Sequence, residues 1–450
     1  MAQVKTLDTA FLKAQDPDQH ASLAIGAVAV VDGAVPDFEL LKELLAERVQ
    51  SIPRCTQVLR TQDFEWVGCP EFDLAHHVRR VAIPRPGDDA ELSRAIARAL
   101  ERPLDLDRPL WECWVIEGLK GNRWAILMKI HHCLTDDNSA AHLLTRLCDD
   151  ADGDTFADHV GAKELSSLQP QKPGWADVLG RAAALAGTLV AAMWPAPPSL
   201  IDPVMRRYVT VRVPIADVDS VCRKFGVTVN DVALAAITEG FRRVLLRRGE
   251  EPRADSLRTL VPMPVRSAML PYLPVEHDDP VQQLRTVHNR WKIQKVQHAD
   301  KRQPGIIESA INCLPTPVRS NVLQLMARLP QAGIVTLGTH APGPRHQLRL
   351  MGQTMERLLP IPPTALQLST GVAVLSYGDE VVFGITAEYD AAADVKQLAT
   401  GIELGIARMV ALSQDSVLLF SKDHRRKRAA RAFPGPAQRA RPSAPTPARR

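Results

Sequence analysis

The pattern of apolar and polar residues changes repeatedly between the period of a strand and that of a helix over the first 150 residues. The run SLAIGAVAVV at 22–31 is almost wholly apolar and rich in Val and Ile, which predicts a buried strand. Pro103 would end the second of three predicted helices, and Asp137 or Asn138 would cap the third. Strands are predicted at 22–31, 111–117 and 124–130, and helices at 36–52, 88–104 and 139–148. Strands and helices therefore mix around one core.

The second half of the chain repeats this mixture after an irregular stretch. PAPPSLIDP at 195–203 has the composition of a linker, and the apolar segment 182–194 before it is predicted to be a helix. Asn230 or Asp231 is expected to start a strongly amphipathic helix that Gly249 ends. Later elements are predicted as a strand from Tyr208, a helix at 229–249, a strand at 257–266, a hairpin at 371–390 turning at Gly378-Asp379, and a helix at 394–412.

Length and composition fit two domains. The chain has 450 residues and 45% hydrophobic content, enough for two cores. We expect an N-terminal domain at 1–155, a crossover at 156–205, a C-terminal domain at 206–420 and a disordered basic tail at 421–450. The tail holds ten Lys or Arg and one Asp, a net charge of +9, so the total of +4 leaves −5 for the rest.

The cysteine pattern and the length of the apolar runs indicate the cellular compartment in which we expect the protein. The seven cysteines are odd in number and form no CxxC pair, which predicts free thiols in a reducing compartment. The longest strongly apolar stretch, 182–194, has 13 residues, short of the roughly 20 that span a bilayer. We therefore expect a cytoplasmic protein without a membrane-spanning segment. No Gly-rich nucleotide-binding motif occurs.

The chemistry-bearing motif is IHHCLTDD at 130–137, where a predicted buried strand ends and a helix begins. Neighbouring side chains on a strand point to opposite faces, so only one of His131 and His132 can face a given cavity. A neutral imidazole suits general-base work on a hydroxyl, and Asp136 can orient it. On residue types alone, two structural histidines remain an alternative. A metal ion bound by both histidines and Asp136 is a less favoured alternative, because neighbouring ligands on a strand point apart.

The motif resembles the HHxxxDG signature of the CoA-dependent acyltransferase superfamily, which includes chloramphenicol acetyltransferase and the condensation domains of peptide synthetases. More narrowly, the chain resembles bacterial wax ester synthase/diacylglycerol acyltransferases. The resemblance is spread over most of 5–412. Its blocks include LDTAFLKAQDPDQ, RPLDLDRPLWECWVIEGL with Pro109-Leu110-Trp111, HHCLTDDNSAAHLL, and VTVNDVALAAITEGFRRVL with Asn230-Asp231.

The resemblance implies an α/β (α+β) fold of two chloramphenicol-acetyltransferase-like domains with a tunnel at their interface. It assigns His132 as the general base and makes His131 and Asp136 mainly architectural. Pro109, Leu110, Trp111, Asn230 and Asp231 are placed at a domain contact or near the tunnel. Purely structural interpretations remain open, with Trp111 packed in the core and Asn230-Asp231 capping a helix.

Three positions depart from the family pattern. Asp137 replaces the final Gly of the motif; pointing inward it would raise the pKa of His132, and pointing outward it would cap a helix. The segment after Arg266 is about ten residues shorter than the family pattern, and of an Arg-rich stretch only Arg54 is retained. We therefore expect Asp137 to be a residue of the tunnel or of the structural motif, without a catalytic role.

The resemblance implies acyl-CoA-dependent esterification of a lipid hydroxyl, with diacylglycerol as acceptor and triacylglycerol as product. Long-chain alcohols giving wax esters, acyl transfer from a carrier protein, and a catalytically impaired member that binds lipid without turnover are the alternatives. No cofactor or metal is expected, because acyl-CoA is a co-substrate. Contact with the inner face of the membrane or with lipid bodies is a hypothesis for the basic tail and 182–194. Specific nucleic-acid binding is not expected.

Overall fold

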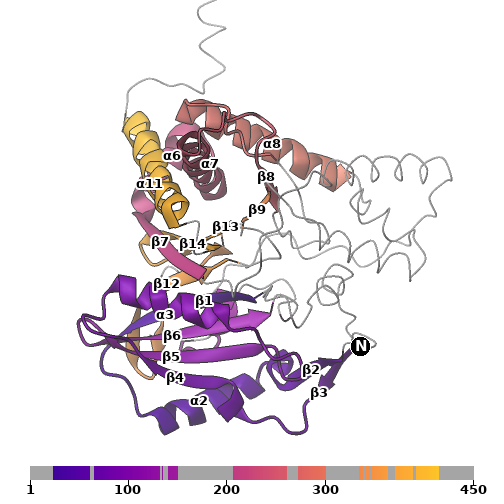
Figure 1. The fold of residues 1–450 in the computed structure, drawn as a ribbon, viewed down its shortest axis with the longest axis vertical. Helices are drawn as coiled ribbons and strands as arrows, with labels where there is room; N and C mark the ends of the chain where they lie inside the picture. The colour runs from indigo at the N-terminus through magenta and orange to yellow at the C-terminus, as the bar shows by residue number, and fades with distance from the viewer. Residues whose placement is uncertain are drawn as a thin grey trace, which may run out of the picture.

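The computed structural model describes residues 24–60, 65–131, 134, 140–150, 206–260, 272–300, 334–337, 341–344, 346–362, 370–388 and 392–414. They form two halves, each a sheet covered by helices, with the N-terminal half in indigo and purple in Figure 1. Of the described helices, none is long and apolar enough to cross a membrane.

The N-terminal half is built on a six-stranded sheet in the order β11-β12-β1-β6-β5-β4, in which β11 (Arg349–Leu350) and β12 (Gln353–Ile361) come from the C-terminal part of the chain. The central strands β1 (Ala24–Asp32) and β6 (Arg123–His131) pair antiparallel, with Ala24 opposite His131. Nearly every residue of both is buried, which explains why their sequences are apolar without alternation. The other elements are α2 (Phe38–Gln50), β2 (Gln57–Arg60), β3 (Glu65–Gly68), β4 (Val78–Ala82), α3 (Asp89–Glu101), β5 (Trp111–Leu119) and α4 (Ala140–Thr145).

Two helices cover opposite faces of this sheet. α2 buries Leu41, Leu45 and Val49, one side chain per turn, in the core formed by one face of β1 and β6. α3 buries a similar stripe in a separate core on the other face. Each helix begins at an aspartate, Asp37 or Asp88, whose carboxylate accepts hydrogen bonds from two backbone N–H groups of the first turn.

The C-terminal half is built on a second sheet in the order β7-β14-β13-β9-β8. Its long helices α7 (Val229–Arg247) and α11 (Ala392–Gln414) pack closely, since a Cβ added at Gly401 would lie 2.6 Å from the Cα of Gly240. The other elements of this half are β7 (Arg206–Pro214), α6 (Ile215–Phe225), β8 (Arg258–Leu260), α8 (Pro280–Asp300), β9 (Ile334–Leu337), β10 (Ala341–Pro342), β13 (Thr370–Tyr377) and β14 (Glu380–Glu388).

Two strands from the C-terminal part of the chain, β11 and β12, complete the N-terminal sheet. β12, orange in Figure 1, pairs antiparallel with β1, placing Ile361 opposite Gly26. Its backbone also meets the second sheet: the Tyr208 hydroxyl donates to the Pro360 carbonyl at 2.9 Å, and a Cβ on Gly384 would lie 1.8 Å from that oxygen. The two halves are therefore joined through β12, which the sequence patterns did not reveal. The domain bounds 1–155 and 206–420 stay predictions.

The predicted elements that lie wholly in the described ranges are confirmed, with ends shifted by a few residues, and of the strand predicted at 257–266 the described part is β8. The 371–390 hairpin turns at Gly378-Asp379 as expected, with Gly378 at a φ of 54°. The helix predicted at 229–249 begins at Val229 as expected, but the interpretation of Asn230 or Asp231 as its N-cap is wrong. Thr228 is the N-cap, because its hydroxyl accepts from the Asp231 N–H and the Asp231 carboxylate accepts from the Thr228 N–H. The segments 182–194 and 421–450 lie outside the described residues.

Candidate active site

The His-His motif begins at the last residue of β6. His131 is buried, and its backbone N–H donates to the Leu110 carbonyl at 2.8 Å. Strand alternation puts its side chain on the face of Lys129 and Leu127, which is the face that α3 covers. The structure thus brings together two of the predicted site residues, His131 and Leu110, which are 21 positions apart in the chain.

Three other predicted residues, His132, Asp136 and Asp137, lie outside the described residues. His132 is joined to His131 by one peptide bond, at the end of a strand whose position is defined. The general-base role of His132, the architectural role of Asp136 and the two orientations considered for Asp137 therefore stay predictions.

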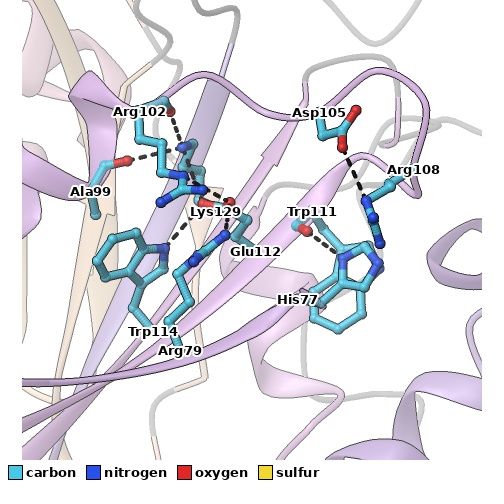
Figure 2. Close-up of polar contacts among 10 residues, drawn as sticks. All are labelled: His77, Arg79, Ala99, Arg102, Asp105, Arg108, Trp111, Glu112, Trp114 and Lys129. Carbon is cyan, nitrogen blue, oxygen red and sulfur yellow. Dashed lines mark hydrogen bonds and ion pairs between the residues drawn. The ribbon is translucent and has the colours of Figure 1, made fainter. Parts of the chain in front are cut away.

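Trp111 is held inside the core that contains α2. Its indole stacks on the His77 ring, with centroids 4.5 Å apart and planes 20° apart, and its Nε1–H donates to the Cys55 carbonyl at 2.8 Å. His77 Nδ1 lies 2.8 Å from the Trp111 carbonyl (Figure 2). With Pro109 and Leu110 also buried, these contacts fix the backbone to which the His131 N–H is bonded.

A buried charged cluster lies on the His131 face of the sheet, and the sequence reasoning missed it. Lys129, with no exposed surface, stands directly opposite Glu112 on β5, and its Nζ is 3.4 Å from a Glu112 carboxylate oxygen. The same carboxylate accepts from Trp114 Nε1 at 3.2 Å and from Arg79 at 3.3 Å (Figure 2). The available signal was a lysine within the apolar run WAILMKI, because a strand buried on both faces rarely carries a charge.

Burial shifts the ionisation of these groups. Loss of hydration lowers the pKa of Lys129 to about 8, and the attraction of Glu112 offsets part of that effect. Burial also lowers the pKa of His77, which favours a neutral ring against Trp111. For Cys113, between Glu112 and Trp114, burial raises the pKa to about 12, so this thiol is a poor nucleophile.

The second predicted motif lies at the start of α7 in the other half. Asp231 is buried, and besides its capping bond its carboxylate lies 3.0 Å from His288 Nδ1 on α8. Asp231 therefore bonds to the start of its own helix and to a neighbouring helix, and these contacts explain the burial of its carboxylate. In the described part of the chain, no three His, Cys, Asp or Glu residues are grouped so that they could hold a metal ion.

The architecture is similar to that of three solved structures. The wax ester synthase/diacylglycerol acyltransferase from Marinobacter aquaeolei VT8 superposes with a TM-score of 0.62 at 22% identity, covering 92% of this chain and 100% of that one. The trichothecene 15-O-acetyltransferase TRI3 of Fusarium sporotrichioides gives 0.61 at 12% identity, covering 90% and 95%. A condensation domain of the calcium-dependent antibiotic synthetase gives 0.56 at 14%, covering 93% and 98%. The expected two-domain α/β fold is confirmed, whereas the tunnel expected at the domain interface stays a prediction.

Sequence comparison narrows this class to one family. Residues 4–196 match the wax ester synthase/diacylglycerol acyltransferase catalytic domain, and 266–409 match the C-terminal domain of the same family. A Mycobacterium tuberculosis protein named for diacylglycerol O-acyltransferase activity is 63% identical over 99% of both chains. Another from that organism, tgs1, also named for this activity, is 46% identical over 92% of this chain and 97% of its own. The chain belongs to the wax ester synthase/diacylglycerol acyltransferase family, and its predicted enzyme class, an O-acyltransferase, is confirmed.

Proposed function

We propose that the protein transfers the acyl group of an acyl-CoA to the free hydroxyl of diacylglycerol and so forms triacylglycerol. The observation that carries the proposal is the 63% identity, over 99% of both chains, to a relative named for this activity. The unbroken placement of β6 up to His131, directly before the proposed base, agrees with it.

In the proposed mechanism, His132 accepts the proton of the acceptor hydroxyl while its oxygen attacks the thioester carbonyl carbon. The tetrahedral intermediate then collapses, the carbon–sulfur bond breaks, and the imidazolium returns the proton to the CoA thiolate. His131 and the Pro109-Leu110-Trp111 segment hold the backbone from which His132 extends. No cofactor or metal takes part in this scheme, so full activity after dialysis against EDTA is expected.

The test is transfer by the purified full chain with radiolabelled oleoyl-CoA and either diolein or hexadecanol, with lipid products separated by thin-layer chromatography. We expect labelled triacylglycerol, and a loss of about 10²–10⁴-fold in His132→Ala because the general base is removed. The half-exposed His76 provides a control variant, His76→Ala, which should keep the wild-type rate.

Other products would redirect the proposal. Label in wax ester alone would make long-chain alcohols the acceptors, and transfer only from an acyl carrier protein would replace the donor. No product with any acceptor, from protein that still binds lipid, would indicate a catalytically impaired family member. A His132→Ala variant with the wild-type rate would contradict the mechanism.

Peripheral contact with anionic lipid is proposed for the basic tail. Its net charge of +9 opposes the −5 of the rest, and each basic residue near an anionic surface contributes about 1 kcal/mol. Flotation with phosphatidylglycerol vesicles should carry the full chain but not a chain ending at residue 420, and phosphatidylcholine vesicles should carry neither. Equal flotation of both chains would contradict a role for the tail.

A further inference from the structure

Lys129 and His131 each bind one end of the segment 102–110, which leads from α3 to β5. At the first end, Lys129 Nζ donates to the Ala99 carbonyl at 2.9 Å and to the Arg102 carbonyl (Figure 2). At the second end, the His131 N–H donates to the Leu110 carbonyl at 2.8 Å. The two residues are two positions apart, so their side chains point to the same face of β6.

Lys129 donates hydrogen bonds to backbone carbonyls at the C-terminal end of α3. The last carbonyls of a helix have no partner within the helix, and Ala99 and Arg102 lie at that end of α3. An ammonium group there satisfies two carbonyl oxygens and interacts favourably with the negative end of the helix dipole. Glu112, opposite on β5, balances the charge and ties the same point to Trp114 and Arg79.

A charged pair in this position costs stability that an apolar pair would not. Removing two ions from water carries a large free-energy penalty, and well-packed apolar replacements of such a pair are often neutral or stabilising. An apolar pair could fill the space between β5 and β6, but it could not bind the Ala99 and Arg102 carbonyls. Attachment of the segment is thus the contribution that is specific to the charged pair.

We propose that Lys129, supported by Glu112, is a positioning residue that fixes the segment 102–110 against the end of β6 and thereby sets the backbone of His131. Through the peptide bond after His131, this arrangement orients the start of the motif that carries the proposed base. The inference rests on the proposed function for its kinetic consequence, but its structural consequence is independent of activity.

The decisive variant is the apolar pair Lys129→Met/Glu112→Leu, which keeps the bulk and removes both charges. Unlike Lys129→Met alone, it does not leave the buried Glu112 carboxylate without its ammonium partner; Arg79, which is partly exposed, and Trp114 lose their Glu112 acceptor. We expect it to fold with a melting temperature close to that of the wild type, yet to lose about 10²-fold in kcat, the size of loss that misplacement of a reacting group produces. KM for oleoyl-CoA and for diolein should change by less than about twofold, because the substrates are still bound.

Amide hydrogen exchange supplies the readout that needs no activity. In the double variant, exchange at the His131 amide, which the Leu110 carbonyl protects, should be about tenfold faster because the segment opens more often. The matched control Arg80→Gln/Glu117→Gln removes a partly exposed ion pair between β4 and β5, and should alter neither exchange at His131 nor kcat.

The outcomes separate the two proposals. A wild-type protein without transfer activity would defeat the proposed function, while exchange at His131 would still decide the positioning role. Wild-type exchange at His131 in the folded double variant would overturn the inference. Should the double variant not fold, Glu112→Gln takes its place; it keeps the side-chain size, and we expect the same two changes at smaller size.

Discussion

Each half of the molecule buries charged side chains, and one from each half, Lys129 and Glu239, shows that such charges are used differently. Lys129 lies in a central strand with its surface wholly covered, and its partners are backbone carbonyls at a helix end and a carboxylate that is itself buried. Glu239 lies on α7, where it accepts from Arg243 at 2.9 Å and is 3.5 Å from Arg408 on α11. Those two arginines remain about a third exposed, at 33% and 34%.

The partners of the two residues show why Lys129 bears on the candidate active site and Glu239 on helix packing. Glu239 also accepts from Gln283, so it joins α7, α8 and α11, and its arginine partners can turn to water if it is lost. Lys129 instead determines where a connecting segment meets the strand that ends at the His-His motif. Burial of a charged side chain does not by itself indicate a functional role; the segment that the charge positions indicates it.

The contact between the halves offers the largest expected effect. A methyl group in Gly384→Ala would lie 1.8 Å from the Pro360 carbonyl oxygen, so β12 and β14 must separate. We expect a loss of about 3 kcal/mol or more in the free energy of unfolding, measured by urea denaturation. Gly68→Ala is the control, since no atom lies within 4 Å of the added carbon and no change is expected. Equal stability of the two variants would show that β12 does not hold the halves together.

Single substitutions of Lys129 and of Glu239 test the comparison of these two buried charges directly. Lys129→Met leaves Glu112 and two helix-end carbonyls without their shared partner and should cost about 3 kcal/mol of unfolding free energy. Glu239→Gln keeps the shape and frees arginines that can reach water, so about 1 kcal/mol is expected. Urea unfolding of both variants gives the values, and the reverse order would contradict the distinction drawn between the two halves.

The pH dependence of stability should report Lys129. Its pKa is lowered to about 8 in the folded protein from 10.5, so between these values the unfolded chain binds more protons. The contribution of this group to the free energy of unfolding therefore rises with pH through that window, by up to about 1.4 kcal/mol per pH unit for one proton. Relative to Lys129→Met, the wild type should gain stability from pH 8 to pH 10 and show no such trend below pH 7. Lys120→Met, at an exposed position, should follow the wild type.

The smallest effect is expected at the ring that supports Trp111. His77→Phe preserves an aromatic stack but leaves the Trp111 carbonyl without its 2.8 Å partner, for a cost of about 1 kcal/mol. His76→Phe, at the neighbouring exposed position, is the control. Differential scanning calorimetry measures both, and a destabilised control with an unaffected His77→Phe would argue against the role given to this ring.

The sequence predicted the parts of the site that depend on neighbours along the chain. The run ending in Ile130-His131 identified a buried strand that stops at the motif, and the helices on both faces followed from their spacing. The N-cap of α7 was assigned to the wrong residue because Thr228, Asn230 and Asp231 are all good capping residues, and only the bonds formed show which one caps. Lys129 was overlooked because its partners come from α3 and β5, far from it in sequence.

By itself, the order of blocks along the chain determined the family, the enzyme class and the alternation of strands and helices. Such features are set by local periodicity and by motif spacing. The tertiary structure alone decided that β12 completes the N-terminal sheet, that Trp111 stacks on His77, and that Lys129 binds the end of α3. The physical reason is that period and propensity fix which side of an element is buried but not which distant element covers it; partners are chosen when the whole core packs.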